Sequence, residues 1–409
     1  MSITRRKLLA AAAAGGAGLA IPFAARAQKN YGPGVTDTSI KIGNTGPYSG
    51  PASSYGTIPK TYAAYFKMIN DQGGINGRKI DFISYDDGYS PPKTVEQTRK
   101  LVESDGVLLV FGSIGTPTNS AVHKYLNAKK VPQLFVASGA TKWGDPQHYP
   151  WTIGWQPNYQ SEGRVYASYI LKHAPNGKIA VLYQDDDYGK DYLNGLLYGL
   201  GDKAKTMIVA KAPYETTDPT VDSQVVSFKS AGADVFVDIT IPKFAAQAIR
   251  QAAEIGWKPL HILNSVSNSV GGVLKPAGLE NAKGLISDFY LKDPTDPTWK
   301  NDKGYKDWVA FMDKYYPDGD KTSGFPVFGY SNAQTLVQVL KQCGDDLTRE
   351  NVMKQVANLH NLALPMLLPG ITLNTSPTDF YPVKQMRMGR FDGKRWALFG
   401  PILSAAARV

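Results

Sequence analysis

The chain has 409 residues, with 45 Lys and Arg against 35 Asp and Glu, a formal net charge of +10 and a single cysteine, Cys343. One cysteine excludes an intramolecular disulfide and a thiolate metal cluster. The basic residues are scattered among acids, without the basic stripe that is typical of nucleic-acid binding. Cys343 continues the apolar helical series of Ala333, Leu336 and Leu340, so we expect a buried structural thiol.

The first residues predict an export signal. Arg5-Arg6-Lys7 precede an Ala-, Gly- and Leu-rich run from Leu8 to Ala25, and Ala25-Arg26-Ala27 is a small-x-small site before Gln28. We therefore expect a signal peptide over residues 1–27, cleaved near Ala27. The paired arginines resemble a twin-arginine signal, but the usual aromatic-leucine pair is replaced by two leucines, so the general secretory route stays open. The alternative is an uncleaved anchor, but the run falls short of the ~20 strongly apolar residues that span a bilayer.

From Ser39 onward, short β-rich runs alternate with amphipathic stretches, which predicts βαβ units. The first strand is expected at Ser39–Gly43, and apolar residues from Tyr62 to Ile69 recur at helical spacing after it. The turn Gly73–Gly77 then leads into a strand at Ile80–Tyr85. Further strands are expected at Val107–Phe111, Gln133–Val136, Lys178–Tyr183, Thr206–Ala210, Val235–Ile239, His261–Leu263 and Gly284–Phe289.

The number of strands exceeds what one open sheet commonly holds, which indicates two doubly wound, Rossmann-like lobes with a cleft between them. The fold class is therefore α/β with largely parallel sheets. Near the end of the chain, Val383–Phe391 and Lys394–Phe399 flank Asp392-Gly393 and predict a β-hairpin.

Ligands of open α/β sheets bind beyond the carboxyl ends of the strands, so the loops after the strands are the candidate sites. After Val107–Phe111, we expect Thr116 to cap a helix whose first position is Pro117. The free backbone N–H groups and the hydroxyl there suit a carboxylate, with Gly115 and Thr116 as contacts. An ordinary helix cap is the alternative.

Two further loops combine hydroxyls with aromatic rings and suit a pocket wall. Isolated aromatic residues more often pack than recognise ligands, so structural roles stay open for them. The candidates from the two loops are Tyr48, Ser54, Tyr55, Ser138, Gly139, Thr141 and Trp143.

Asp185–Gly189 follows a predicted strand and precedes a helix. Three successive acids suggest a metal site, but their spacing lacks the alternating acids and distant Glu of a calcium loop. We therefore expect Asp187 to cap the helix and Tyr188 to contact a ligand.

Catalytic motifs are missing from the sequence: there is no G-x-S-x-G, H-E-x-x-H, G-x-x-x-x-G-K-[ST] or G-x-G-x-x-G. The five histidines are dispersed along the chain. We expect a protein that is not an enzyme and that has no cofactor and no metal site.

Three segments carry a resemblance to a known family: Ile42-Gly43 through Ser49–Ala52 with Tyr55-Gly56, Asn70–Arg78, and Asp185–Gly189 after Val181–Tyr183. With these segments the chain resembles the branched-chain amino-acid (Leu/Ile/Val) class of type I periplasmic binding proteins. The resemblance covers nearly all of the chain after residue 27. It implies two lobes joined by three crossovers, which close around a ligand and deliver it to a membrane permease.

Positions in the family pattern suggest roles for several residues. The resemblance implies that Tyr55 covers the ligand, that Gly115-Thr116 hold a carboxylate, and that Gly139 and Thr141 contact an amino group. Tyr188 matches a contact from the second lobe. The family's amino-acid binders also use an acid where this chain reads Leu263–Asn268, a segment without an acid that includes the candidate Ser267. Asp238, at the end of a predicted strand, is the candidate to supply that charge.

We therefore expect a periplasmic solute-binding protein of an ABC importer, whose partners are the permease subunits in the inner membrane and which binds no nucleic acid. The expected ligand is a small organic acid or amide without a free α-amino group, aromatic compounds included. The alternatives are a branched-chain amino-acid receptor, a ligand sensor for a membrane signalling partner, and a secreted hydrolase. The lobes are expected at residues 36–153 with 290–376 and 154–289 with 377–409, joined by a three-segment hinge.

Overall fold

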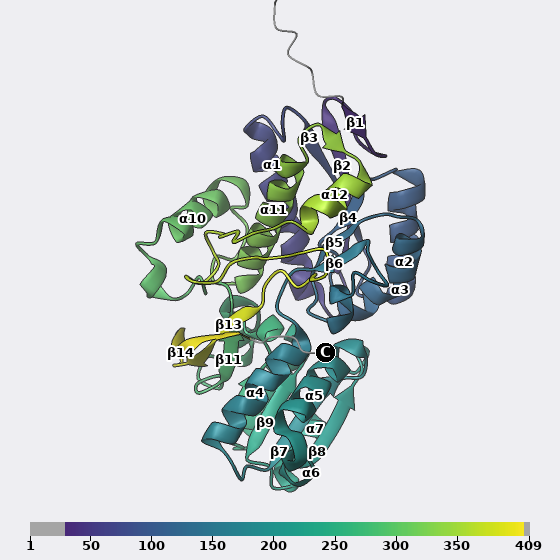
Figure 1. Cartoon of the computed structure of the whole chain (residues 1–409). Coiled ribbons are helices and arrows are strands. Elements are labelled where there is room, and N and C mark those ends of the chain that lie inside the picture. The colour runs from purple at the N-terminus through teal and green to yellow at the C-terminus, as the bar shows by residue number, and fades with distance from the viewer. Residues whose placement is uncertain (1–28, 405–409) are drawn as a thin grey trace, which may run out of the picture.

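The computed structural model describes residues 29–404, which form two α/β lobes stacked end to end (Figure 1). The expected signal peptide, residues 1–27, lies outside the described residues. The first lobe contains a parallel five-stranded sheet in the order β3-β2-β4-β5-β6. Its strands are β2 (Ser39–Gly46), β3 (Lys79–Asp86), β4 (Leu109–Phe111), β5 (Gln133–Val136) and β6 (Thr152–Gly154).

The second lobe contains a seven-stranded sheet in the order β14-β13-β11-β10-β9-β7-β8. Five of its strands are parallel, and β13 and β14 add an antiparallel hairpin beside β11. The strands are β7 (Ile179–Gln184), β8 (Ile208–Tyr214), β9 (Val235–Ile239), β10 (Leu260–Leu263), β11 (Ile286–Phe289), β13 (Gln385–Phe391) and β14 (Trp396–Ser404). A separate two-stranded parallel pair joins β1 (Asn30–Tyr31) to β12 (Asp346–Leu347).

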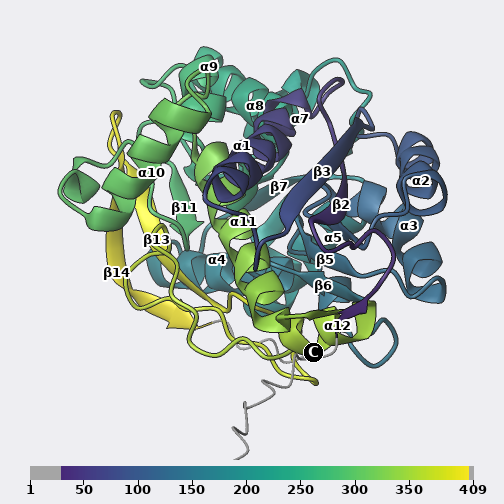
Figure 2. The same ribbon diagram turned by 90° about the horizontal axis from the view of Figure 1, so that it is seen from above.

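Helices cover the faces of both sheets, as the βαβ alternation predicts. Around the first sheet lie α1 (Thr57–Asp71), α2 (Pro91–Arg99), α3 (Thr116–Ala128), α10 (Lys303–Tyr315), α11 (Gly324–Cys343) and α12 (Arg349–Val356). Around the second sheet lie α4 (Tyr159–His173), α5 (Asp187–Leu200), α6 (Ala204–Met207), α7 (Asp222–Ser230), α8 (Pro242–Glu254) and α9 (Lys275–Ala277). Seen from above, the β13–β14 hairpin runs along the side of the molecule near α10 (Figure 2).

The chain passes between the two sheets three times. It leaves the first sheet after β6 and enters the second lobe at α4, returns to the first lobe after β11, and comes back to the second sheet at β13. This arrangement places the carboxyl ends of strands from both lobes around the space between them. The residue boundaries expected for the lobes stay a prediction.

Most of the strands lie where the sequence places them, and Gln133–Val136 and Val235–Ile239 coincide with β5 and β9. The expected strand Thr206–Ala210 is wrong at its start, because residues up to Met207 belong to the short helix α6. The strand β8 lies at the edge of its sheet, where Pro213 is tolerated and alternate residues stay exposed. The apolar pattern of β8 in the sequence is therefore weak.

The core confirms the two patterns on which the helix predictions rest. Tyr62, Tyr65, Phe66 and Ile69 are all buried on one face of α1. Cys343 is buried at the end of α11, and this burial raises the pKa of its thiol to about 12. The thiol is therefore a packing group at neutral pH. Within residues 29–404, no helix has both the length and the apolar character that crossing a bilayer requires.

Candidate binding cavity

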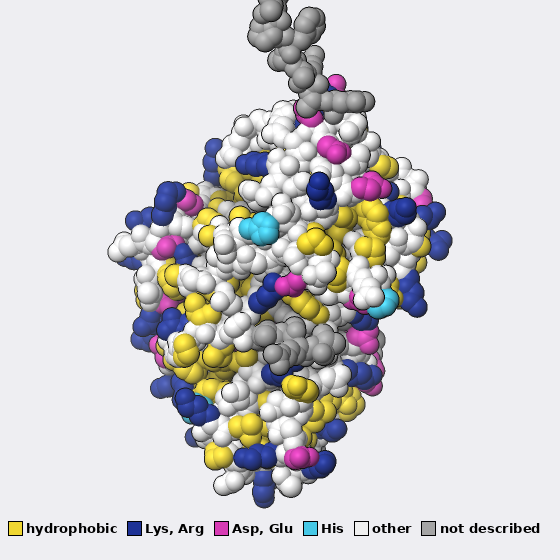
Figure 3. All heavy atoms as spheres, viewed as in Figure 1, with side chains coloured by type: hydrophobic (Ala, Val, Ile, Leu, Met, Phe, Trp, Pro, Cys, Tyr) yellow, Lys and Arg dark blue, Asp and Glu magenta, His cyan; other side chains and the backbone are white. Residues whose placement is uncertain are grey.

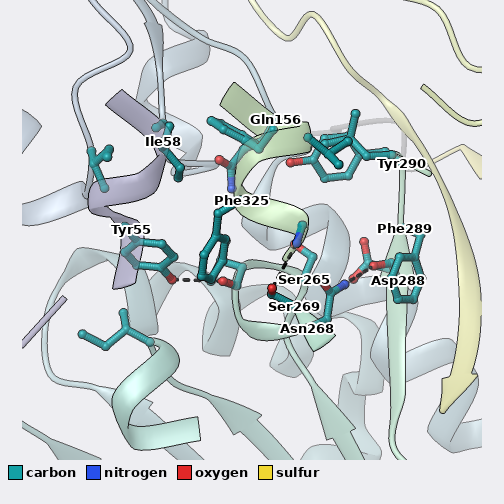
Figure 4. Close-up of a pocket in the computed structure, with 18 of the residues that line it drawn as sticks. Tyr55, Ile58, Gln156, Ser265, Asn268, Ser269, Asp288, Phe289, Tyr290 and Phe325 are labelled. Carbon is teal, nitrogen blue, oxygen red and sulfur yellow. Dashed lines mark hydrogen bonds between the residues drawn. The ribbon is translucent and has the colours of Figure 1, made fainter. Parts of the chain in front are cut away.

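A cavity lies between the two lobes and is lined by residues from both lobes and from the crossing segments (Figure 4). It encloses about 880 Å³ of space, part of which is continuous with solvent. The lining is mainly aromatic and aliphatic, with polar groups at a few points. A volume and lining of this kind suit a small ligand with an apolar body and a few polar groups.

Aromatic rings form the walls. Tyr55, from the turn before α1, contacts Phe325 of α11 edge to face, with 5.1 Å between ring centroids. Tyr188, at the start of α5, contacts Tyr159 of α4 in the same way at 5.4 Å. The predicted contacts Tyr55 and Tyr188 therefore line the cavity from different lobes. Such rings can enclose a flat or apolar ligand body from two sides.

The predicted carboxylate loop also reaches the cavity, through Gly115 and Thr116. Gly115 has φ of +100°, and a Cβ there would lie 2.4 Å from the Tyr89 ring, so this position requires glycine. The expectation that Thr116 caps the helix is wrong, because α3 begins at Thr116 and the capping position is Gly115. The N–H of Thr116 lies in the first turn, where N–H groups have no acceptor within the helix.

The Thr116 hydroxyl has a different partner, Ser138, with 2.7 Å between Oγ1 and Oγ. Ser138 Oγ already accepts hydrogen bonds from Trp143 Nε1 at 2.8 Å and from the Ala140 N–H at 3.2 Å. A hydroxyl has two acceptor lone pairs and one donor, so the Ser138 O–H donates to Thr116. The Thr116 O–H is then not used by Ser138, and Thr116 is one of the residues that line the cavity. Ser138 and Trp143 thus act behind the cavity wall, by orienting Thr116.

The other residues expected in this loop join the lobes and do not line the cavity. Thr141 hydrogen-bonds through its N–H and its hydroxyl to Asp191 of α5, at 2.7 to 3.0 Å. Gly139 packs against the crossing segment, where a Cβ would lie 2.2 Å from the Pro157 carbonyl oxygen. Both residues therefore hold the first lobe against the second.

Tyr48 and Ser54 also lie outside the cavity lining. Tyr48 is half-buried, and its hydroxyl lies 2.6 Å from Ser84 Oγ in the same lobe. Ser54 is exposed in the turn before α1. Of the three candidates in this first loop, only Tyr55 reaches the cavity.

The acidic turn before α5 is a helix cap, but the capping residue is Asp186, and the expectation of Asp187 is wrong. Asp186 Oδ1 accepts hydrogen bonds from the N–H groups of Tyr188 and Gly189. Asp187, one residue later, pairs instead with Lys142 across the two lobes. Within residues 29–404, no three metal-ligating side chains come together as a metal would require.

Asp238 and Ser267 are fully buried away from the cavity lining. Asp238 accepts a hydrogen bond from the Thr240 hydroxyl at 2.6 Å and lies 3.2 Å from His261 Nε2. Ser267 donates to the Thr240 carbonyl oxygen. Their polar groups are satisfied within the second lobe, so neither offers a free group to a ligand in this arrangement.

Sequence reasoning missed an acid that lines the cavity, Asp288 at the end of β11. Asp288 is fully buried, and its Oδ1 accepts a hydrogen bond of 2.5 Å from the Tyr166 hydroxyl. The same hydroxyl lies 3.2 Å from Oε2 of Glu162, which also accepts from Tyr192 at 2.6 Å. An acid inside a predicted buried strand is a signal in the sequence, because Asp is rarely fully buried without a partner.

Burial sets the protonation of this acidic pair. It raises the pKa of Glu162 well above its usual range, and the neighbouring charge of Asp288 adds to the effect. Burial also raises the pKa of Asp288, against the hydrogen bond from Tyr166. Two coupled carboxyl groups lose their protons in separate steps, so this pair keeps a proton to higher pH than separate, exposed carboxyl groups would.

Hydrogen bonds between residues that line the cavity join the two lobes. The Tyr55 hydroxyl donates to the Val266 carbonyl oxygen (Figure 4), and the N–H of Gly324 donates to Ser269 Oγ at 3.0 Å.

Over the outer face shown in Figure 3, basic and acidic side chains are interspersed.

The comparisons with known proteins agree with this architecture. A family model described as periplasmic binding protein matches residues 39–395. The Leu/Ile/Val-binding protein homolog 1 of Brucella suis is 26% identical over 322 residues, which cover 76% of this chain and 80% of that protein.

Two solved structures show the same fold. A branched chain amino acid ABC transporter protein from Thermus thermophilus with bound valine has a TM-score of 0.81 and 16% identity, covering 91% of this chain and 98% of that one. A fatty acid ABC transporter substrate-binding protein from Thermomonospora curvata has a TM-score of 0.75 and 21% identity, covering 92% and 95%. The chain therefore belongs to the periplasmic binding protein family, whose members bind solutes and are not enzymes.

Proposed function

We propose that this protein is the receptor of an ABC importer for a small organic acid or amide with an apolar body, aromatic compounds included. The observation that carries the proposal is the orientation of the Thr116 hydroxyl, which Ser138 leaves as a donor at the cavity. With the N–H of the first turn of α3, it offers two donors to a ligand carboxylate or carbonyl oxygen. The aromatic walls around Tyr55 and Tyr188 suit the apolar body.

A branched-chain amino acid is the second candidate. Two observations favour it: the name of the Brucella relative and the acid Asp288, which lines the cavity although Leu263–Asn268 contains none. The loop at Gly115-Thr116 would serve an amino acid's carboxylate equally well. The two candidates therefore differ near Asp288. An amino acid would place its α-ammonium group there, whereas the proposed organic acid or amide has no such group.

A thermal-shift panel followed by calorimetry separates these candidates. The panel contains leucine, valine, benzoate, phenylacetate, benzamide and 4-methylpentanoate. A compound that binds only the folded protein stabilises it by about 2.7 kcal/mol at a hundred times its dissociation constant. We expect stabilisation by acids or amides. Tight binding of leucine and valine, with no response to the others, would replace this ligand class by the second candidate.

The site in the cell and the partners are part of the same proposal. The family places such receptors in the periplasm, and the sequence of residues 1–27 supports a signal peptide that is cleaved near Ala27. Permease subunits in the inner membrane are the proposed partners. Uptake of a bound compound should be lost when the gene for this protein is deleted, and it should be restored when the gene is supplied again. Unchanged uptake, together with a lost transcriptional response to that compound, would indicate a sensor.

A further inference from the structure

Tyr290 presents to the cavity a hydroxyl group that the protein itself does not use. The residue directly follows β11, lines the cavity and is only 8% exposed. Its hydroxyl forms no hydrogen bond with any group of residues 29–404, and its oxygen keeps accessible surface. Burial raises the pKa of Tyr290 well above its usual range, so the hydroxyl stays protonated and can donate at neutral pH.

Gln156 adds a second unused polar group. It lies after β6, in the first segment that crosses between the lobes, and is only 6% exposed at the cavity. Its Nε2 donates to the Tyr159 hydroxyl at 3.4 Å, whereas its Oε1 accepts no hydrogen bond from residues 29–404. Figure 4 shows the hydroxyl end of Tyr290 and the amide end of Gln156 directed into the same part of the pocket. One donor and one acceptor without partners therefore face the cavity from two crossing segments.

Both segments are held in place from behind. Trp155, which precedes Gln156, packs edge to face against the Tyr290 ring, with 5.9 Å between ring centroids. The Trp155 indole N–H donates to Thr335 Oγ1 of α11 at 2.9 Å, and the Tyr290 carbonyl oxygen accepts from the Leu368 N–H at 2.9 Å. Groups that are already oriented lose little conformational freedom on binding, so their hydrogen bonds contribute more fully to affinity.

The charges near Tyr290 favour a neutral ligand group. After burial itself, the charge of Glu162 is the next cause of the raised pKa of Tyr290. An anionic ligand group beside this hydroxyl would meet the same unfavourable charge. Lys292 also lines the cavity, but it already pairs with Asp302 at 2.6 Å. A second ligand carboxylate is therefore disfavoured at this place.

We propose that Tyr290 and Gln156 form a subsite for a hydroxyl group of the ligand, separate from the oxygen acceptor that Thr116 binds. The ligand hydroxyl accepts from the Tyr290 O–H and donates to Gln156 Oε1, so one oxygen atom satisfies both unused groups. An ammonium group offers no acceptor to the Tyr290 O–H, and a C–H group serves neither residue. This subsite rests on the proposed function, and it narrows the ligand class to hydroxylated acids or amides with an apolar body.

Calorimetry on matched compounds that differ by one hydroxyl group tests the subsite. Benzoate is compared with its 2-, 3- and 4-hydroxy derivatives, phenylacetate with the corresponding hydroxyphenylacetates, and 4-methylpentanoate with its 2-hydroxy derivative. We expect at least one hydroxylated compound to bind about fivefold or more tightly than its parent, as two neutral hydrogen bonds imply. Equal or weaker binding of every hydroxylated compound, with a parent acid still bound, would overturn the subsite and leave the proposed function standing. No binding of any of these compounds, nor of any acid or amide in the wider panel, would overturn both.

Two variants place the preference on these residues. Tyr290→Phe removes only the hydroxyl, so the hydroxylated compound should lose most of its advantage while the parent acid keeps its affinity. Gln156→Leu removes the acceptor and should act in the same way, which keeps the subsite testable where Tyr290→Phe fails to fold. Tyr48→Phe is the matched control, since the Tyr48 hydroxyl bonds to Ser84 away from the cavity. An advantage that persists in either folded variant, or that is also lost in Tyr48→Phe, would overturn the subsite.

Discussion

The hydroxyl of Tyr55 in the first lobe donates a hydrogen bond to the backbone carbonyl oxygen of Val266 in the second lobe, at 3.0 Å. The same tyrosine ring lines the cavity and packs edge to face against Phe325. One side chain thus forms part of the binding surface and a contact that holds the cleft shut. Closure and binding are therefore coupled through it.

Tyr55→Phe should weaken ligand binding while leaving the ring in the wall. It removes one neutral hydrogen bond between the lobes, so we expect a loss of about 0.5–1.5 kcal/mol, measured by calorimetry. Tyr48→Phe is the control, since the Tyr48 hydroxyl bonds to Ser84 within one lobe. Equal losses in both variants would show that the contact with Val266 has no special part in closure.

Closure itself predicts a change of shape. Since the chain crosses between the lobes at three places, we expect a hinge motion when a ligand binds. Small-angle scattering should show a smaller radius of gyration at saturating ligand than without it. An unchanged radius would mean that the lobes keep the same arrangement without ligand. The hydrogen bonds between Thr141 and Asp191 would then be sufficient to hold the two lobes together.

Thr116→Val should weaken binding of a carboxylate-bearing compound by about 1–3 kcal/mol, because it removes a donor to a charged group. The shape of the side chain is nearly unchanged, so the melting temperature should move less than the affinity. Unaltered affinity in calorimetry would leave this loop with a structural role only.

Trp143→Phe tests the chain of hydrogen bonds behind Thr116. Without the indole N–H, Ser138 Oγ has a free lone pair, and the Thr116 O–H can turn toward it. We expect a smaller loss of affinity than in Thr116→Val. In the double variant the Trp143→Phe change should have almost no further effect, which a double-mutant cycle measures.

Asp87 predicts a pH dependence of stability that is separate from ligand binding. It is fully buried, and burial raises its pKa to about 6 against hydrogen bonds from the Tyr89 N–H and the Thr94 hydroxyl. The pKa of Asp87 is therefore higher in the folded protein than in the unfolded chain, where it is near 4. The protonated carboxyl group stabilises the fold below pH 4, and this contribution is lost as the pH rises through about 6.

Asp87→Asn should remove that dependence. Between pH 4 and pH 7, the free energy of unfolding of the unaltered protein, measured with urea, should fall by about 1–3 kcal/mol relative to that of the variant. Asp71→Asn is the control, since Asp71 is exposed at the end of α1, where it pairs with the exposed Lys67. Parallel pH curves for the protein and Asp87→Asn would contradict the prediction.

The parts of the fold that could be predicted from the sequence are those that depend on local periodicity. Strands such as Val235–Ile239, buried on both faces, give unbroken apolar runs, and the Asp392-Gly393 turn marks its hairpin. The edge strand β8 lacks that signal because it is half exposed and contains Pro213.

The site was harder to predict, because a residue's place beside a strand does not fix where its side chain points. Ser138 and Trp143 lie in a loop at the cavity, yet they act through Thr116. Asp238 and Asp288 both lie near the ends of buried strands, and only the second reaches the cavity. The side chain of Asp238 instead contacts the Thr240 hydroxyl and the His261 ring. The sequence alone does not reveal these contacts.

The antiparallel hairpin beside β11 also has a consequence for how the chain folds. The strands of the first sheet lie within residues 39–154, but β11 ends at Phe289 and pairs with β13, which begins at Gln385. Such a distant pairing is slow to form, and until it forms β11 is an open edge on which another chain can add. A chain synthesised or translocated only as far as β11 therefore cannot complete its second lobe. Late completion keeps this edge unpaired for longer and so exposes the chain to aggregation.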